Sequence, residues 1–193
     1  MRVVSGTAKG RGLKAVPGRS TRPTSDKVKE AIFSRIGPYF DGGKALDLYA
    51  GTGGLGIEAL SRGMEGAIFV DIEKKAVDVI RENLQHARLL DRAEVYRNDA
   101  EKALKHLAKR GVSFDLVLLD PPYRLKNMDE LLGQMQTLGL LNPLADVVIE
   151  HDAAHVYTEQ IGELIEVKRM NYGDTAVTVY RYEPRNDNSE RRG

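Results

Sequence analysis

The sequence of 193 residues contains no cysteine. This excludes a disulfide framework, a thiolate metal site and a cysteine nucleophile. The chain also lacks an apolar run near the roughly 20 residues that a membrane span needs, and its N-terminus lacks the apolar core of a signal peptide. We therefore expect a cytoplasmic location without membrane contact. Hydrophobic residues make up 41% of the chain, which excludes wholesale disorder.

The formal net charge is only +1, but charge is unevenly distributed along the chain. Residues 1–35 carry nine basic and two acidic side chains, a net +7, which leaves 20 basic and 26 acidic side chains, a net −6, for the rest. A basic arm on an acidic body is typical of nucleic-acid binding, although a solvated lysine-rich terminus has the same composition. We predict phosphate contacts from four residues of the arm: Lys9, Arg11, Arg19 and Arg22.

From residue 44 onward, short apolar runs alternate with segments of helical periodicity. Seven strands are predicted, at 44–49, 67–70, 94–97, 114–119, 146–150, 165–170 and 175–182. Helices are predicted between them, at about 54–62, 73–88, 100–110 and 127–138. This order indicates an α/β fold with a doubly wound, mainly parallel sheet covered on both faces, which ends in an antiparallel hairpin.

The segment before this alternation reads as a basic extension, residues 1–40. Two β-prone runs at 2–5 and 13–16, joined by glycine-rich residues 6–12, predict a small hairpin. A helix follows the N-cap candidates at 24–26 and ends near Ile36, before Gly37-Pro38. We assign 41–183 to the α/β domain and 184–193 to a flexible tail.

A glycine-rich turn directly follows the first strand of the α/β domain. Its glycines Gly51, Gly53 and Gly56 have the Gly-x-Gly-x-x-Gly spacing that lets a backbone turn tightly and approach a ligand at a helix N-terminus. Asp71 ends the second strand 20 residues after Gly51, where a carboxylate can accept both ribose hydroxyls of a nucleoside. The turn alone fits a dinucleotide and S-adenosylmethionine equally well.

Asp47 distinguishes between these two candidate ligands. Its carboxylate lies within the first strand, four residues before Gly51, and would repel a pyrophosphate. The amino-acid end of S-adenosylmethionine, which carries an ammonium and a sulfonium, suits a negative charge there. After the third strand, Asn98-Asp99-Ala100 offers a carboxylate for an adenine amino group and a backbone N–H for a ring nitrogen. We therefore favour S-adenosylmethionine as the cofactor.

The most specific stretch is Asp120-Pro121-Pro122-Tyr123, at the end of an apolar strand. The two prolines fix the backbone and have no N–H, so the turn presents acceptors only: the Asp120 carboxylate and the Pro121 carbonyl. Such a rigid ledge fits an exocyclic amine whose two N–H bonds need acceptors, and the Tyr123 ring can stack on a planar base. We assign catalysis to these four residues, with Asp120 stabilising the charge that develops on the amine nitrogen.

The Asp47–Gly53 turn together with Asp120–Tyr123 resembles class I S-adenosylmethionine-dependent amino-methyltransferases. Over residues 1–182 the chain is similar to the RsmD-type bacterial 16S rRNA (guanine-N2)-methyltransferases, through Arg2-Val3-Val4-Ser5-Gly6, Thr21-Arg22-Pro23-Thr24 and Glu58-Ala59-Leu60-Ser61-Arg62-Gly63. The resemblance implies a seven-stranded Rossmann-like sheet, a target guanine at Asp120–Tyr123, and a substrate of 16S rRNA within an assembling small ribosomal subunit. The cofactor site it implies comprises Asp47, Gly51, Gly53, Asp71 and Asp99. To these we add the neighbouring Tyr49, Thr52, Ile72, Asn98 and Ala100.

Several alternatives stay open at this point. The Asp-Pro-Pro-Tyr turn also serves adenine-N6 methylation of DNA or RNA, and a non-catalytic ribosome-assembly factor on the same fold would retain the basic arm. Either Asp71 or Glu73 is a candidate for the cofactor ribose. The four histidines have no metal-binding or catalytic spacing, so we predict no metal site, and we expect a monomer.

Overall fold

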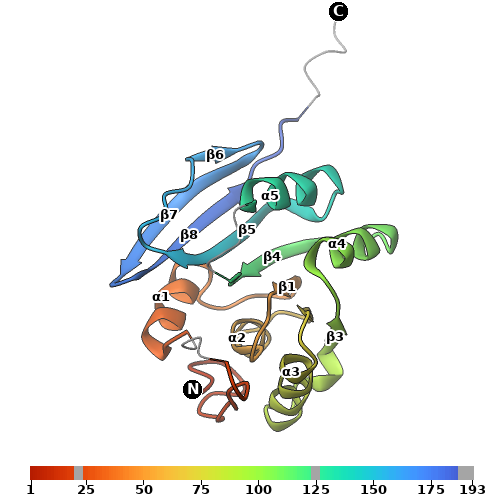
Figure 1. The fold of residues 1–193 in the computed structure, drawn as a ribbon, viewed down its shortest axis with the longest axis vertical. Coiled ribbons are helices and arrows are strands. Elements are labelled where there is room, and N and C mark those ends of the chain that lie inside the picture. The colour runs from red at the N-terminus through yellow and green to blue at the C-terminus, as the bar shows by residue number, and fades with distance from the viewer. Residues whose placement is uncertain (20–23, 123–126, 187–193) are drawn as a thin grey trace, which may run out of the picture.

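The computed structural model describes residues 1–19, 24–122 and 127–186. Within them, a single mixed sheet runs in the order β3-β2-β1-β4-β5-β8-β7-β6 (Figure 1). The strands are β1 (Lys44–Leu48), β2 (Gly66–Asp71), β3 (Ala93–Arg97), β4 (Phe114–Leu119), β5 (Leu141–Asp152), β6 (Gln160–Ile161), β7 (Leu164–Tyr172) and β8 (Thr175–Tyr182). The helices are α1 (Asp26–Ile36), α2 (Gly54–Ser61), α3 (Lys74–His86), α4 (Ala100–Lys109) and α5 (Met128–Thr137), with a short 3-10 helix at Leu90–Arg92.

The predicted fold class is confirmed. The first five strands pair in parallel, and β5, β8, β7 and β6 pair in antiparallel fashion. All seven predicted strands are present. The two-residue β6 is an eighth at the edge, too short to produce a period in the sequence. The strand order reverses between β1 and β4, and at such a reversal the carboxyl ends of parallel strands form a ligand crevice.

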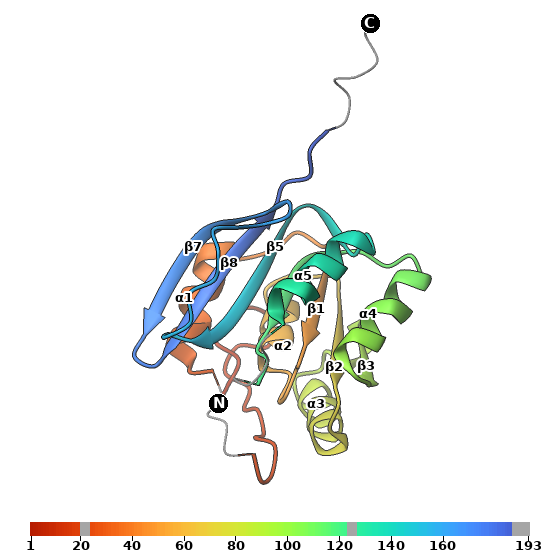
Figure 2. The same ribbon diagram turned by 45° about the horizontal axis from the view of Figure 1, so that its top comes forward.

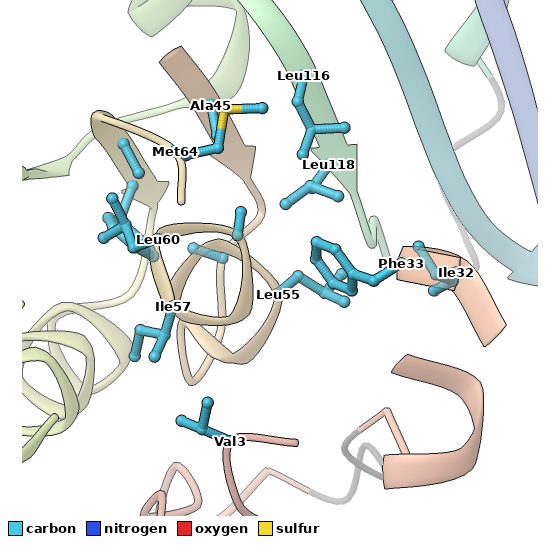
Figure 3. Close-up of a cluster of buried hydrophobic side chains, with 14 of the residues drawn as sticks. Val3, Ile32, Phe33, Ala45, Leu55, Ile57, Leu60, Met64, Leu116 and Leu118 are labelled. Carbon is cyan, nitrogen blue, oxygen red and sulfur yellow. The ribbon is translucent and has the colours of Figure 1, made fainter. Parts of the chain in front are cut away.

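Helices cover both faces of the sheet (Figure 2). Apolar side chains of α1, α2 and α3 pack on one face in a core that includes Phe33, Leu60 and Ile80. Side chains of α4 and α5 pack on the other face with Leu104 and Leu131. Figure 3 shows the first core, in which Phe33 of α1, Leu55 of α2 and Leu118 of β4 point toward one another. No helix in the described residues is long and apolar enough to cross a membrane.

The predicted N-terminal hairpin is wrong in its register. The structure pairs the start of the chain with residues 10–13, through the isolated bridge Arg2↔Gly12 and a hydrogen bond from the Val3 N–H to the Arg11 carbonyl at 2.9 Å. The run 13–16 packs on α3 instead, where the Lys14 N–H donates to Asn83 Oδ1 at 2.8 Å. A side-chain amide 69 residues away satisfies the backbone of this run, and nothing local in the sequence signals that contact.

A buried ion cluster joins the extension to the α/β domain. The Lys29 and Glu58 side chains are fully buried, 3.6 Å apart, and the Arg62 Nε donates to Glu58 Oε1 at 2.9 Å. The Glu58 carboxylate also accepts the backbone N–H groups of Val4 and Ser5, at 2.9 and 3.0 Å. One carboxylate on α2 thus holds α1, Arg62 and the first strand-like segment together. Of the predicted tail, residues 187–193 lie outside the described residues.

Candidate active site

Acidic side chains gather at the carboxyl edge of four neighbouring strands. Asp71 ends β2, Asp47 lies in β1, Asp120 follows β4, and Glu150 lies near the end of β5. The register of the parallel strands determines where each acid lies along the strand direction. Asp47 is paired with Phe69 of β2 and Leu118 of β4, and Leu119 of β4 is paired with Ile149 of β5. The strand reversal between β1 and β4 therefore carries a row of carboxylates.

The glycine turn is built for close backbone approach. Gly51 and Gly53 have φ of +58° and +78°, and Gly53 is the N-cap residue of α2. The Ala50 N–H donates to the Val70 carbonyl at 2.9 Å, which fixes the turn against β2. Thr52 supports the same turn, because its hydroxyl accepts the Gly54 N–H at 3.2 Å and its carbonyl accepts Asn83 Nδ2 at 2.9 Å.

Gly56 has a different role from the other two glycines. A Cβ at this position would collide with the Phe69 ring of β2 and would lie 3.0 Å from Asp47 Oδ2. Glycine therefore permits close packing of α2 on the sheet, and its N–H donates to Asp47 Oδ2 at 2.9 Å. This contact orients the Asp47 carboxylate at the helix N-terminus.

Asp47 is 1% exposed. Burial raises its pKa to about 8, the Gly56 N–H opposes that shift, and the negative charge of Asp71 adds to it. A buried carboxylate with one hydrogen-bond donor is short of positive partners. It therefore fits the ammonium group of an amino-acid ligand, which would stabilise the ionised form.

Asp71 is 4% exposed and organises the loop around it. Its carboxylate accepts the backbone N–H groups of Gly51 and Glu73, both at 2.9 Å. It also pairs with the Arg19 guanidinium at 3.1 Å, and Arg19 lies 3.3 Å from the Glu73 carboxylate. The two candidate ribose acceptors thus share one arginine.

Arg19 is the predicted phosphate contact whose placement differs most from expectation. The structure puts its guanidinium at the cofactor turn, where a Cβ on Gly51 would lie 3.2 Å from Arg19 Nη1. Lys9, in contrast, is exposed and follows Ala8, whose N–H donates to Ser61 Oγ at the C-terminal end of α2. Arg11 Nη1 donates to the His86 carbonyl at 3.1 Å, at the C-terminal end of α3. Of these three residues of the extension, Arg19 is therefore the one at the glycine turn. Arg22 lies outside the described residues.

The segment after β3 closes the side of the turn. Asp99 is the N-cap of α4, which begins at Ala100, and its carboxylate accepts the Lys102 N–H at 3.1 Å. The Asn98 N–H donates to the Asp71 carbonyl at 3.1 Å, so this loop and the end of β2 are in contact.

Two further predicted cofactor residues flank this loop. Tyr49, at φ +62°, is half-buried, and burial followed by the charges of Asp99 and Glu101 raises the pKa of its phenol to about 12. Ile72 is a large apolar side chain that is 61% exposed at the end of β2. An exposed isoleucine beside polar loops offers a flat apolar contact for an adenine or ribose.

Asp120 lies where β4 meets the two prolines. Pro121 is buried and Pro122 is exposed. The Asp120 residue as a whole is exposed to solvent, but neighbouring protein atoms shield its carboxyl group from part of that solvent. These surroundings raise its pKa well above the usual value, and the negative charges of Glu150 and Asp47 raise it further, whereas Arg19 lowers it. Asp120 is thus within electrostatic reach of both the glycine turn and β5. Tyr123, the last residue of the predicted catalytic turn, lies outside the described residues.

Glu150 is the site residue that sequence reasoning missed. Its Oε2 accepts the Thr24 hydroxyl at 2.6 Å, from a threonine that is itself buried in the extension. Burial raises the pKa of Glu150, and the Thr24 hydrogen bond opposes the shift. One signal in the sequence could have identified it: an apolar run of β5 is followed by the acidic Glu150. The same pattern of an apolar run and then an acid occurs at Asp71 of β2 and at Asp120 after β4.

A cavity of about 580 Å³ lies away from the carboxylate row. It opens between the extension and α3 and is lined by Met1, Gly12, Leu13, Lys14, Glu82, Asn83, Gln85 and His86. None of the predicted site residues lines it, so its size says nothing about the carboxylate row. Among residues 1–19, 24–122 and 127–186, no three His, Asp or Glu side chains are grouped to hold a metal ion.

This fold and this site define a class of protein: the S-adenosylmethionine-dependent methyltransferases. The evidence is the strand reversal, the glycine turn at the start of α2, and the buried Asp47 and Asp71 beside it. An RNA methyltransferase from Salinibacter ruber, solved in complex with S-adenosyl-L-homocysteine, shares the fold with a TM-score of 0.63 at 16% identity, over 86% of this chain and 96% of that one.

Within this class, the chain belongs to the family described as Conserved hypothetical protein 95, whose model matches residues 1–181. It is 51% identical over 181 residues to "Putative rRNA methyltransferase YlbH" of Bacillus subtilis, covering 94% of this chain and 98% of that protein. It is 32% identical over 151 residues to "Ribosomal RNA small subunit methyltransferase D" of Haemophilus influenzae, covering 78% of each. The solved structure of "Putative methyltransferase yhhF from Escherichia coli" superposes with a TM-score of 0.80 at 28% identity, over 96% of this chain and 99% of that one.

Proposed function

We propose that the chain methylates the exocyclic N2 amine of a guanine in 16S rRNA. The observation that supports the proposal is that Asp120, which follows β4 and precedes two prolines, is close enough to the buried Asp47 and to Arg19 for their charges to act on its carboxyl. S-adenosylmethionine supplies a methyl group activated by its sulfonium. We assign its amino-acid end to Asp47 and its ribose to Asp71 or Glu73, and its adenine to the Asn98-Asp99-Ala100 segment with Tyr49, Thr52 and Ile72 alongside.

The ledge has two tasks in this reaction. First, the Asp120 carboxylate and the Pro121 carbonyl accept the two N–H bonds of the amine, which orients the nitrogen lone pair. Second, an amine that has gained a methyl group must lose a proton, and Asp120 is the nearest acceptor. Its raised pKa increases its proton affinity, so the same carboxylate that holds the amine can receive that proton.

The ribosomal substrate is supported by the relatives and by the basic extension. The relative at 51% identity carries the name "Putative rRNA methyltransferase YlbH", and the one at 32% identity the name "Ribosomal RNA small subunit methyltransferase D". The extension adds a net +7 within residues 1–35, with Lys9 exposed on it. An excess of positive charge on the extension favours a polyanionic substrate over a free nucleoside. We propose cytoplasmic action on an assembling small subunit, as a monomer.

The decisive experiment offers labelled S-adenosylmethionine with immature small ribosomal subunits, naked 16S rRNA and duplex DNA, followed by nucleoside analysis. We expect N2-methylguanosine from the small subunit or its RNA. N6-methyladenine in any of the three would replace the guanine assignment. The absence of label from all three would favour an assembly factor without activity. Mapping of the labelled nucleotide identifies the target guanine.

The extension yields a prediction about salt dependence. Replacing Lys9 and Arg11 with serine is expected to weaken RNA binding and to reduce the slope of log K against log salt by about 1 to 2, because each phosphate contact contributes about 0.7 to 0.9. Filter binding over a salt series measures the slope. Lys105 and Lys109, exposed on α4, provide a control pair that removes the same charge elsewhere. Equal slopes for both pairs would contradict an RNA contact by the extension.

Asp47 yields a prediction about pH. Its pKa is about 8, and a cationic ligand binds the ionised form, so binding below pH 8 must release the Asp47 proton. The affinity for S-adenosylhomocysteine, whose amino-acid end retains the ammonium, is therefore expected to rise by up to about tenfold per pH unit and to level off near pH 8. In Asp47→Asn, binding should be about 10-fold weaker at pH 8, with little pH dependence. Calorimetric titration measures both, and equal pH slopes for the two proteins would remove Asp47 from the site.

A further inference from the structure

Glu150 and Asp120 occupy equivalent positions on neighbouring strands. Leu119 and Ile149 are paired in the parallel ladder of β4 and β5, so the next residues, Asp120 and Glu150, follow side by side. Neighbouring strands lie about 4.8 Å apart. Because side chains alternate between faces, Glu150 shares the face of Val148, which packs in the core of α1 and α2. The carboxylate therefore points toward the extension, as its contact with Thr24 shows.

Thr24 fixes one oxygen of this carboxylate. Its hydroxyl donates to Oε2 at 2.6 Å across 126 residues of sequence. Within residues 1–19, 24–122 and 127–186, no hydrogen bond to Oε1 is found. Glu150 is half-buried, and its Oε1 is not among the buried side-chain atoms of the described residues that lack a partner, so this oxygen reaches solvent. It can therefore accept a donor from a ligand.

Guanine offers one donor more than the ledge uses. Its Watson–Crick edge carries the two N–H bonds of the N2 amine and, directly beside them, the N1–H. Adenine has an unprotonated N1 at the corresponding place, a lone pair that repels a carboxylate. Asp120 and the Pro121 carbonyl provide acceptors for the amine, and the next acceptor along the sheet edge is Glu150.

We propose that Glu150, oriented by Thr24, accepts the N1–H of the target guanine and so selects guanine over adenine. The inference rests on the proposed function, which it deepens by naming the residue that reads the base. It also accounts for two carboxyls side by side. Each has a raised pKa, Asp120 in part through the charge of Glu150, and N–H donors from one base would stabilise both negative charges.

The test compares guanine with 2-aminopurine, which keeps the N2 amine but has an unprotonated N1. Synthetic RNA spanning the mapped target carries either base at that position. For wild-type protein, we expect kcat/KM on guanine to exceed that on 2-aminopurine by at least about 100-fold. Glu150→Gln should lower kcat/KM on guanine about 10- to 100-fold, because a neutral amide replaces a charge-assisted acceptor. The same substitution should leave kcat/KM on 2-aminopurine within about threefold of the wild-type value, since the amide N–H can donate to the unprotonated N1.

The measured quantity is the change in the guanine to 2-aminopurine ratio, in which the loss of the guanine O6 cancels between proteins. Thr24→Val should shrink the ratio about 3- to 10-fold in the same direction and guards against misfolding of the glutamine variant. Glu130→Gln, at an exposed position of α5, is the matched control and should leave the ratio unchanged. Affinity for S-adenosylhomocysteine should stay within about twofold in all three variants.

Two adverse outcomes are distinguishable. Wild-type methylation of guanine with an unchanged ratio in Glu150→Gln and Thr24→Val would overturn the role of Glu150 and leave the proposed function standing. Wild-type methylation of adenine at the mapped site would overturn both, because a carboxylate that accepts N1–H has no partner on adenine.

Discussion

Asp120→Asn is expected to lower the rate of methyl transfer about 10³-fold while the affinity for S-adenosylhomocysteine changes less than about threefold. The substitution keeps the shape of the ledge and the two prolines but replaces a carboxylate with an amide. The amide stabilises positive charge on the amine less well, and it cannot receive the amine proton. General-base and electrostatic contributions of this kind are each worth about 10² to 10⁴ in rate.

Single-turnover kinetics with labelled cofactor and calorimetric titration measure the two quantities separately. Asp91→Asn is the matched control, an exposed aspartate in the 3-10 helix before β3, and should leave both unchanged. A rate within about tenfold of wild type in Asp120→Asn would show that positioning by the rest of the ledge is sufficient. A large loss of cofactor affinity would instead indicate that Asp120 contacts the cofactor rather than the target amine.

The row of acids illustrates what this sequence predicts well. Asp47, Asp71 and Asp120 were found because each lies in or just after an apolar strand, and parallel strands bring their carboxyl ends to one edge. Periodicity alone placed the helices of the α/β domain to within one or two residues of their bounds, because each buries one apolar stripe on the sheet.

Three contacts that the sequence did not predict join the extension to the α/β domain. Arg19 meets Asp71, Thr24 meets Glu150, and Lys14 meets Asn83, at separations of 52, 126 and 69 residues. Charge composition predicts that the extension contacts RNA, but composition cannot show which cations are already paired. Lys29, counted there as part of the basic arm, is fully buried.

The buried cluster around Glu58 carries the second large prediction. Burial lowers the pKa of Lys29, and the charges of Glu58 and Asp26 oppose that shift. Arg62 is buried as well, stacks 5.0 Å from the centre of the Phe33 ring, and pairs with both Glu58 and Glu30. Among the carboxylates that the structure describes, Glu58 is therefore the one that contacts both buried cations, and it also accepts the N–H groups of Val4 and Ser5.

Glu58→Ala is expected to lower the free energy of unfolding by about 3 to 5 kcal/mol, because removing one partner of a buried ion cluster leaves uncompensated charge and unpaired backbone donors. Urea denaturation at neutral pH measures the loss, and the exposed Glu65→Ala, which shortens the same side chain at the surface, should change stability by less than about 0.5 kcal/mol.

Limited proteolysis of Glu58→Ala should in addition cut the extension before the α/β domain, because Val4 and Ser5 lose their common anchor. A loss below about 1 kcal/mol with an uncut extension would mean that apolar packing of Val3, Ala8 and Leu13 holds the extension without the ion cluster. In that case the buried charges would serve to fix the position of α1 rather than the stability of the fold.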